Sequence, residues 1–314
     1  MTIADIQKKI MRLKKENNAT ILAHYYQPIE IQQVADYLGD SLGLSRTAKE
    51  NVHGEYIIFA GVRFMAETAS ILNQDKTVLT SHPESLCPMA AYLSAEMVNS
   101  YRNDYPNSQV ITYVNSTAAV KAVSDVCCTS SNAVKIVRNI FEQDKSKTLL
   151  FGPDANLADF VEQETGIELV KMPEEGNCIV HSQVTKDELI EVKKKHPNAI
   201  ILVHPECIRE VREIADIVGS TAQMYEYVKE SPEHQNEFII GTEIGLIERM
   251  KEDMPNNHYY PASDKLTCYN MKKHTIEMVE YALENMDDKT LEVRVPREIA
   301  EKAQIPLEKM LEFS

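Results

Sequence analysis

The sequence lacks any long apolar segment, any excess of basic residues and any recognisable leader. Its longest apolar run is about Tyr56 to Val62, far below the ~18 residues of a membrane-spanning helix. Acidic residues outnumber basic ones by 48 to 33, a net charge of −15, whereas nucleic-acid binding depends on a basic surface. Charged residues such as Asp5 and Lys8 interrupt the first apolar positions, which does not fit a signal peptide. We therefore expect a cytoplasmic protein that binds neither membranes nor nucleic acids.

Several short motifs are also missing. There is no C-x-x-C pair, which argues against a zinc ribbon or finger, and neither a G-x-G-x-x-G fingerprint nor a Walker A sequence occurs. Glycine and proline number only 10 and 13, too few for a fibrous or low-complexity chain. The six cysteines do not predict disulfides in a reducing compartment, and a free cysteine is most often a buried apolar residue. The composition is that of an ordinary globular protein.

Apolar, β-branched runs alternate with amphipathic segments along most of the chain, which indicates β-α units and a parallel sheet. The expected strands are 20–25, 56–62, 77–81, 109–115, 148–153, 167–171, 199–205, 217–220, 237–242 and 259–262. The expected helices include 3–16, 64–72, 133–141, 208–215, 244–251 and 273–285. The fold class is therefore α/β.

An internal repeat of about 90 residues divides the chain. Four features keep this period: a polar residue at the end of a first strand, a hydroxyl residue further on, a glycine ending a second strand, and a cysteine. In that order they are His24, Tyr113 and His204; Ser41, Ser130 and Thr221; Gly61, Gly152 and Gly241; and Cys87, Cys178 and Cys268. We predict αβα repeats over 1–95, 96–184 and 185–270, followed by a helical segment over 271–314.

Three similar units packed around a pseudo-threefold axis would bring equivalent positions together at the centre. Ligands of parallel α/β sheets bind beyond the carboxyl ends of the strands. The repeat therefore predicts one central site at which three strand ends, three hydroxyls and three cysteines meet. Cys127, Cys128 and Cys207 have no partner at this period.

Three thiolates without a matching fourth cysteine suggest a metal centre with one open coordination position. Zinc is possible, but zinc sites usually draw paired ligands from one short turn. Thiolates from distant parts of the chain suit an iron–sulfur cluster better, and an iron without a protein sulfur can act as a Lewis acid. The ordinary alternative is that Cys87, Cys178 and Cys268 are buried core residues.

Hydroxyl residues precede three of the helical patterns: Ser41, Ser130 and the pair Ser220–Thr221. Helix N-capping is the commonest role for serine or threonine at such positions. Helix N-termini with hydroxyls also bind carboxylate and phosphate groups. Around one cavity, these hydroxyls would suit substrates that carry about three anionic groups.

Other polar residues lie at or just past the ends of the first strands of the repeats. They are His24, Tyr26, Tyr113, Asn115, His204 and Glu206. Each one taken singly is most often a structural polar group, but Glu206 follows an apolar run. We expect its carboxylate to be partly buried, with a raised pKa suited to a general base. Four further histidines, His53, His196, His234 and His274, lie in polar stretches and are expected to face solvent.

The motifs as a set resemble the quinolinate synthase family over nearly the whole chain. They are AHYYQ, GDSLGLSR, GVRFMAETA, CPMA, YVNSTAAVKA, TSSNA, GPDANLA, HPEC, GST, GTEIGLI and TCYNMKK. The resemblance implies three homologous αβα domains in a triangle, in agreement with the repeat. It also implies an enzyme of NAD biosynthesis that condenses iminoaspartate with dihydroxyacetone phosphate to give quinolinate, phosphate and water.

The resemblance further implies that Cys87, Cys178 and Cys268 hold a 4Fe-4S cluster whose fourth iron binds substrate. Glu206, Tyr26 and His204 are then the candidate catalytic residues. The candidate substrate-binding residues are His24, Ser41, Tyr113, Asn115, Ser130, His204, Glu206, Ser220 and Thr221. An aspartate-oxidising enzyme is the expected functional partner, since it would supply iminoaspartate. Two alternatives remain, a three-thiolate zinc hydrolase and a non-enzymatic iron–sulfur redox sensor.

Overall fold

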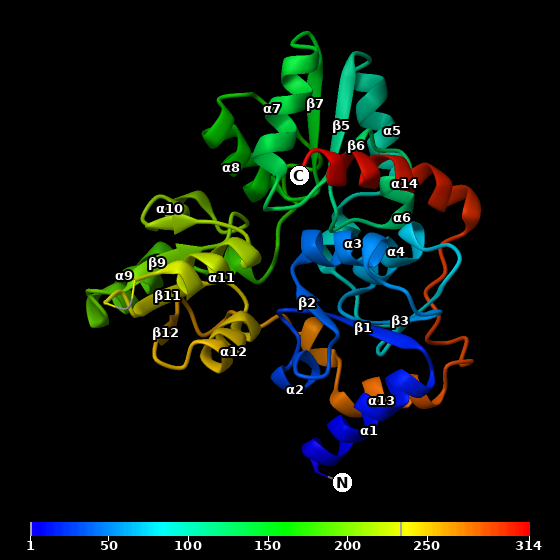
Figure 1. The fold of residues 1–314 in the computed structure, drawn as a ribbon. Helices are drawn as coiled ribbons and strands as arrows, with labels where there is room; N and C mark the ends of the chain where they lie inside the picture. The colour runs from blue at the N-terminus through cyan, green and yellow to red at the C-terminus, as the bar shows by residue number, and fades with distance from the viewer. Residues whose placement is uncertain (1, 233) are drawn as a thin grey trace.

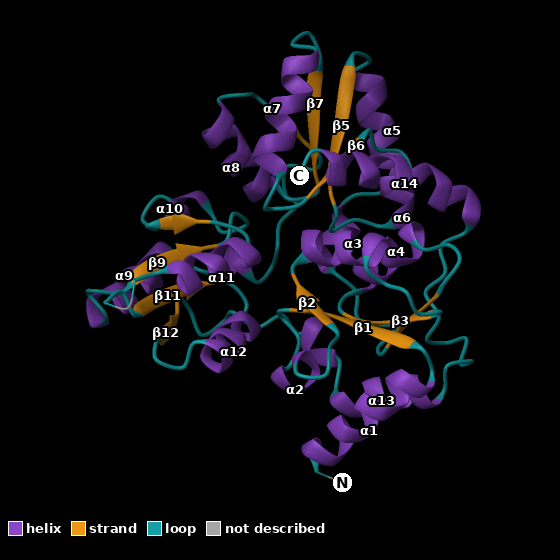
Figure 2. Cartoon of the chain, in the orientation of Figure 1, coloured by secondary structure: helices purple, strands orange, loops and turns teal. Residues whose placement is uncertain are grey.

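The computed structural model describes residues 2–232 and 234–314. Their strands form three separate four-stranded sheets, and every pairing between named strands is parallel. Figures 1 and 2 show the three sheets in three lobes around a common centre, each flanked by helices. The α/β prediction is confirmed.

The same strand order recurs in each sheet. The first sheet runs β2-β1-β3-β4, with strands Tyr37–Gly39, Ala19–His24, Tyr56–Ala60 and Thr77–Thr80. The second runs β6-β5-β7-β8, with strands Val126–Cys128, Ser108–Tyr113, Thr148–Gly152 and Val170–Lys171. The third runs β10-β9-β11-β12, with strands Ile217–Val218, Ile200–Val203, Glu237–Gly241 and His258–Pro261. The chain therefore repeats one topology three times, while the pseudo-threefold axis and the domain boundaries remain predictions.

The helices follow the same repeated order, and a 3₁₀ turn follows each repeat's last strand. The α-helices are α1 Ile3–Glu16, α2 Ile29–Gln32, α3 Ser41–Glu50, α4 Arg63–Leu72, α5 Ala95–Asp104, α6 Ala118–Lys121, α7 Ala133–Gln143, α8 Ala155–Thr165, α9 Lys186–Lys195, α10 Arg209–Arg212, α11 Thr221–Glu230, α12 Ile244–Asp253, α13 Ile276–Glu284 and α14 Arg297–Glu312. The 3₁₀ turns are η1 Pro88–Tyr92, η2 His181–Gln183 and η3 Met271–Lys273. None of these described helices is both long enough and apolar enough to cross a membrane.

The central strands β1, β3, β5, β7, β9 and β11 read as almost continuous apolar runs because helices cover both faces of each parallel sheet. The expected strands all occur, within a few residues of their predicted ends. Two strands were not predicted, β2 and β6. Each has only three residues, which is too short for a periodic pattern to be recognised.

Two helix predictions need correction. The helix expected over 208–215 is the single turn α10, because the chain from Ile214 onward turns into the edge strand β10. The helix expected over 273–285 begins only at Ile276, where the hydroxyl of Thr275 accepts the backbone N–H of Met278 and caps α13. The residues before it form η3.

The segment after the third sheet returns to the first two lobes. Helix α13 packs against α1, and α14 packs against α4, α6 and β6. Between them, the N–H of Val293 donates to the carbonyl of Val78 at 2.8 Å, and Leu79 forms an antiparallel bridge with Glu292. The apolar face of α14 joins the core shared by the first and second lobes.

Candidate active site

One cavity of about 390 Å³ lies at the centre, between the three lobes. Residues from all three repeats line it, as expected if strand ends and helix starts converge there. The predicted site residues that line it are His24, Tyr26, Ser41, Cys87, Tyr113, Asn115, Ser130, Cys178, His204, Glu206, Thr221 and Cys268. Of the predicted set, only Ser220 does not line the cavity.

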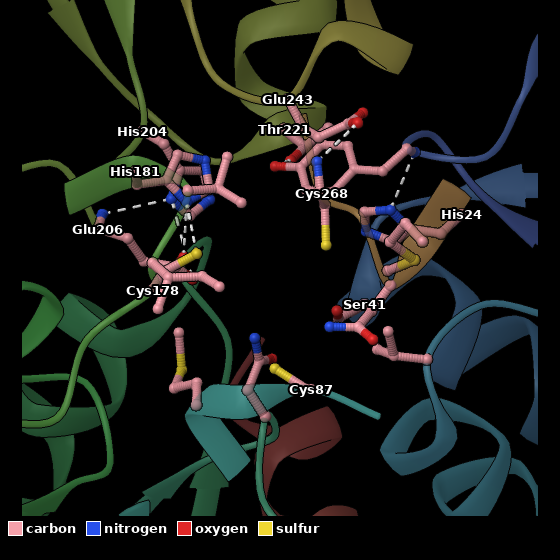
Figure 3. A pocket seen from close by; sticks show the side chains of 18 of the residues that line it. His24, Ser41, Cys87, Cys178, His181, His204, Glu206, Thr221, Glu243 and Cys268 are labelled. Atoms are coloured by element: carbon pink, nitrogen blue, oxygen red, sulfur yellow. Dashed lines mark hydrogen bonds and ion pairs between the residues drawn. The ribbon is translucent and has the colours of Figure 1, made fainter. Parts of the chain in front are cut away.

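The three cysteines that share the repeat lie in equivalent places. Cys87, Cys178 and Cys268 each lie between the last strand of a sheet and a 3₁₀ turn. Figure 3 shows their sulfur atoms turned toward one central space. Burial raises the pKa of all three thiols, to about 12 for Cys87. The charge of Cys268 raises the pKa of Cys87 further, and that of Cys87 raises the pKa of Cys178, so the three thiols lie close enough to influence one another.

Glu206 is held between two side chains of the second lobe. The hydroxyl of Tyr113 donates to its Oε1 at 2.5 Å, and Nδ1 of His181 lies 2.8 Å from its Oε2. The raised pKa that we expected is wrong. Burial acts to raise it, but His204, His181 and Tyr113 together outweigh burial and lower the pKa of Glu206 to about 2. The resting carboxylate is therefore ionised.

The hydrogen bonds of Glu206 continue through His181 to the first lobe. His181 Nε2 lies 2.8 Å from Thr242 Oγ1, and the hydroxyl of Tyr26 lies 2.6 Å from that oxygen and 2.8 Å from Thr221 Oγ1. Because the ionised Glu206 can only accept, His181 donates to it from Nδ1, and in the neutral tautomer of His181 Nε2 is an acceptor. Thr242 then donates to His181, and Tyr26 donates to Thr242. The chain of donors runs from Tyr26 to Glu206.

His24 and His204 are buried as neutral rings. Burial lowers the pKa of each to about 3. Nδ1 of His24 accepts the backbone N–H of Tyr26 at 3.1 Å, and Nδ1 of His204 accepts that of Glu206 at 3.3 Å. Since a neutral imidazole has one donor, the proton of each ring lies on Nε2. Both rings can therefore donate one hydrogen bond to an anionic or carbonyl oxygen in the cavity.

The structure shows which of the four hydroxyl residues, Ser41, Ser130, Ser220 and Thr221, cap a helix and which line the cavity. Ser220 is the N-cap of α11, with a complete capping box to Gln223. Ser41 is the first helical residue of α3, which Asp40 caps, and the cap position of α7 is Asn132 rather than Ser130. Thr221 bonds to Tyr26. Capping therefore explains Ser220, and the other three hydroxyls line the cavity beside the helix starts.

Asn115 lines the cavity with a buried side-chain oxygen that has no hydrogen-bond partner among the described residues. Of the four histidines expected to face solvent, His53 and His234 are exposed and His196 is half-buried against Tyr260. The prediction for His274 is wrong. It is fully buried and bonds to Ser81 at 2.7 Å, because the loop after Cys268 folds back onto the end of β4.

Sequence reasoning missed four polar residues of the site: Asp154, His181, Thr242 and Glu243. Thr242 and Glu243 directly follow β11, and Asp154 lies two residues after β7, so the strand-end argument applied to these strands would have found them. His181 lies three residues after Cys178, and this C-x-x-H spacing could have been recognised in the sequence. The ligand atoms of Cys178, His181 and Glu206 all lie within 4.8 Å of one another.

Three parallel sheets of one topology, set around thiols and a buried acid–base network, define this protein as an α/β enzyme. Residues 8–312 match the family model described as Quinolinate synthetase A protein. The chain belongs to this family of NAD-biosynthesis enzymes.

Curated relatives share much of the sequence over almost their full length. The quinolinate synthase of Pyrococcus furiosus is 45% identical over 99% of both chains, and that of Clostridium kluyveri is 48% identical over 96% of both. The quinolinate synthase of Thermotoga maritima is 43% identical over 97% of this chain and 98% of its own. A solved structure of the E-1-hydroxy-2-methyl-but-2-enyl-4-diphosphate reductase from Plasmodium falciparum aligns over 91% of this chain and 95% of its own, with a TM-score of 0.34 and 10% identity.

Proposed function

We propose that this enzyme condenses iminoaspartate with dihydroxyacetone phosphate to give quinolinate, phosphate and water. The observation that carries the proposal is the meeting of three thiols, an ionised Glu206 and three helix starts in one cavity. The relatives that match over almost their full length are named for this product. The functional link to an aspartate-oxidising enzyme and the cytoplasmic location belong to the same proposal.

The three cysteines fit a 4Fe-4S cluster. Cys87, Cys178 and Cys268 come from three repeats, are free of disulfides and face one space large enough for more than a single ion. Soft thiolate ligands from distant parts of a chain are the usual ligands of iron–sulfur clusters. The raised pKa of each thiol means that a bound metal would displace protons that these sulfurs otherwise keep. When bound, such a cluster supplies a Lewis-acidic iron to a substrate oxygen or nitrogen.

The chain's own residues can bind and orient the anionic groups of both substrates. The helices α3, α7 and α11 begin beside the cavity region that Ser41, Ser130 and Thr221 line, and the N-terminus of a helix favours anionic groups. His24 and His204 add neutral donors at Nε2, and Asn115 adds an amide. This arrangement gives anions local stabilisation inside a chain whose net charge is −15.

Glu206 is the candidate base for the proton transfers. Its ionised carboxylate accepts a proton, and Thr242, His181 and Glu206 form the hydroxyl–imidazole–carboxylate sequence that enzymes use to move protons between a bound molecule and a buried acid. Tyr26 lies at the other end of this sequence, where its hydroxyl can give a proton to Thr242 or take one from a substrate. His204 stacks on His181 with ring centroids 4.4 Å apart and so fixes the plane of that imidazole.

Anaerobic iron and sulfide analysis, followed by an assay for quinolinate, tests the proposal. The reconstituted protein should contain about four irons and four sulfides per chain and form quinolinate from the two substrates. Cys87→Ser, Cys178→Ser and Cys268→Ser should each lose iron and activity, because an alkoxide-type oxygen is a poor replacement for thiolate. Cys127→Ser and Cys207→Ser are matched controls that should keep their iron.

A zinc enzyme is the second candidate, favoured by the close approach of Cys178, His181 and Glu206. A cysteine, a histidine and a carboxylate are all zinc ligands. Stoichiometric zinc, no visible chromophore and hydrolytic activity would support this candidate and contradict the cluster. An iron–sulfur protein without quinolinate synthesis would instead support a redox sensor.

A further inference from the structure

Two buried carboxylates touch the backbone of the proposed cysteine ligands. Asp154 is the N-cap of α8: its Oδ1 accepts the N–H of Leu157 at 2.7 Å and its Oδ2 accepts the N–H of Cys178 at 3.0 Å. Glu243 is the N-cap of α12: its Oε2 accepts the N–H of Gly245 at 2.7 Å and its Oε1 accepts the N–H of Cys268 at 3.1 Å. Both residues are fully buried. Each carboxylate therefore uses one oxygen for its helix and the other for a cysteine.

The two caps occupy equivalent positions in the repeat. In every repeat, the first residue of the helix donates its N–H to the carbonyl two residues before the cysteine. These bonds join Arg63 to Ser85 at 2.7 Å, Ala155 to Gly176 at 2.7 Å, and Ile244 to Leu266 at 2.8 Å. The cap position of the first repeat is Val62, which makes no side-chain capping bond. Two of the three cysteines thus have a carboxylate anchor, and the equivalent residue near Cys87 has no carboxylate to offer.

The loop of Cys87 is held by a different contact. The hydroxyl of Ser85 donates to the carbonyl of Asn270 at 2.7 Å, which ties this loop to the loop of Cys268. Lys272 connects the loop of Cys268 to the first lobe. Its Nζ lies 3.4 Å from Glu243 Oε1 and donates to the carbonyl of Tyr26 at 3.0 Å. Glu243 therefore anchors the loop of Cys268, and Ser85 ties the loop of Cys87 to that same loop.

We propose that Asp154 and Glu243 are positioning residues of the metal centre, which fix the backbones of Cys178 and Cys268 so that their sulfurs keep a geometry suited to metal binding. This inference rests on the proposed cluster at these cysteines. Residues that orient metal ligands commonly change metal affinity by about 10- to 100-fold when they are replaced. Because the loop that Glu243 holds is also tied to the loop of Cys87, replacing Glu243 should weaken metal retention more than replacing Asp154 does.

The test measures the rate at which anaerobic, reconstituted protein loses iron to a chelator. Asp154→Asn and Glu243→Gln keep side-chain size and an oxygen for the helix, but present an amide N–H to the cysteine N–H. Iron release should become about tenfold faster or more, with the larger increase for Glu243→Gln, and the electron paramagnetic resonance spectrum of the reduced cluster should change. Asp154→Glu keeps a carboxylate at this position, as Glu243 does in the third repeat, and should therefore release iron slowly.

Ser94→Ala is the matched control for the loss of a helix cap. The hydroxyl of Ser94 accepts the N–H of Met97 at 3.2 Å and caps α5, whereas the backbone N–H groups of Cys178 and Cys268 are bound by Asp154 and Glu243. This variant should lower the melting temperature and leave iron release within about twofold of the parent protein. The proposal is overturned if Asp154→Asn and Glu243→Gln release iron at the parent rate, or if Ser94→Ala releases it as fast as they do. A parent protein that takes up no iron would contradict the cluster itself before any variant is compared.

Discussion

The ionised state of Glu206 depends on its hydrogen-bond donors rather than on solvent. Tyr113 and His181 each direct a donor at one carboxylate oxygen. Burial of a carboxylate without such donors would raise its pKa. The nearby Asp154 shows that effect, because burial and the charge of Glu206 raise its pKa well above the usual range. Two neighbouring buried acids thus have pKa values shifted in opposite directions.

Glu206→Gln removes the proton acceptor and keeps the size of the side chain. We expect turnover to fall by about 10² to 10⁴, the usual contribution of a positioned acid–base group. Iron content should stay close to that of the parent protein, because Glu206 is not among the proposed cluster ligands. Steady-state kinetics and anaerobic iron analysis give the two values. Full turnover in the variant would remove Glu206 from the chemistry.

The buried imidazoles make the fold sensitive to acid. His24 and His204 have pKa values of about 3 in the native state against an ordinary value of 6.5, and the pKa of Glu206 is lowered from 4.5 to about 2. The unfolded chain therefore binds more protons than the native chain below pH 6.5, and stability is lost progressively as the pH falls toward 3. We expect a nearly constant melting temperature above pH 7 and a steep fall below about pH 6.

His204→Gln should weaken that acid dependence, and His53→Gln should leave it unchanged because His53 is exposed. Melting curves from pH 4 to pH 8 under anaerobic conditions provide the comparison. The same acid slope in both variants would show that His204 titrates in the native state like an exposed histidine.

At the scale of elements, each repeat places one short helix start at the cavity. The edge strand before each of these helices is held by a repeated contact. An aspartate just before β2, β6 or β10 accepts a backbone N–H from the neighbouring central strand. These bonds join Asp36 to Ile21 at 2.9 Å, Asp125 to Val110 at 2.7 Å, and Asp216 to Ile201 at 2.8 Å. The helices α3, α7 and α11 that follow are therefore delivered to equivalent positions.

The hydroxyls at these helix starts should divide into two groups. Ser220→Ala removes the capping box of α11, so it should cost about 1 kcal/mol of stability, or about 2 °C in melting temperature, with little effect on ligand affinity. Ser41→Ala and Ser130→Ala remove no cap and should leave melting almost unchanged. Each should weaken quinolinate binding by about 1.5–3 kcal/mol, the value of a hydrogen bond to a charged group.

Thermal melting and quinolinate titration on the same anaerobic, cluster-loaded proteins separate the two groups. The opposite pattern, with unstable Ser41→Ala and Ser130→Ala proteins that bind quinolinate normally, would reduce these hydroxyls to structural roles.

The sequence predicted the repeat well because equivalent positions obey the same local rules. Runs such as β3 and β11 are apolar on both faces, and cysteines recur after each last strand. The cavity residues at first-strand ends followed from the same rule. His181 did not, because its role depends on contacts to Glu206 and Thr242 of the next repeat, and no local pattern contains such contacts. The charge of Glu206 was missed for the same reason.

At the scale of the whole molecule, the last helix joins two lobes. Leu307 on α14 is fully buried in the core that the first two lobes share, whereas Ile305 on the same helix is 57% exposed. The packing of α14 against α4, α6 and β6 makes the interface between these lobes part of one core. Stability of the two lobes should therefore be coupled.

Leu307→Ala should lower the free energy of unfolding by about 2–5 kcal/mol, because it leaves a cavity in that core. Ile305→Ala is the control and should change stability by less than about 0.5 kcal/mol, since most of its side chain already contacts water. Denaturant unfolding followed by circular dichroism measures both. Equal effects in the two variants would show that α14 does not stabilise the lobes through its buried face.

The bond from Val293 to Val78 has a consequence for how the chain is made. During synthesis, the first lobe leaves the ribosome before residues 276–312 have been translated. The edge strand β4 and the surfaces that α13 and α14 later cover therefore remain exposed to solvent until then. Exposed edges and apolar faces on nascent chains favour aggregation. The first lobe is thus translated before the third lobe but completed only after it, so its folding in the cell depends on residues 276–312.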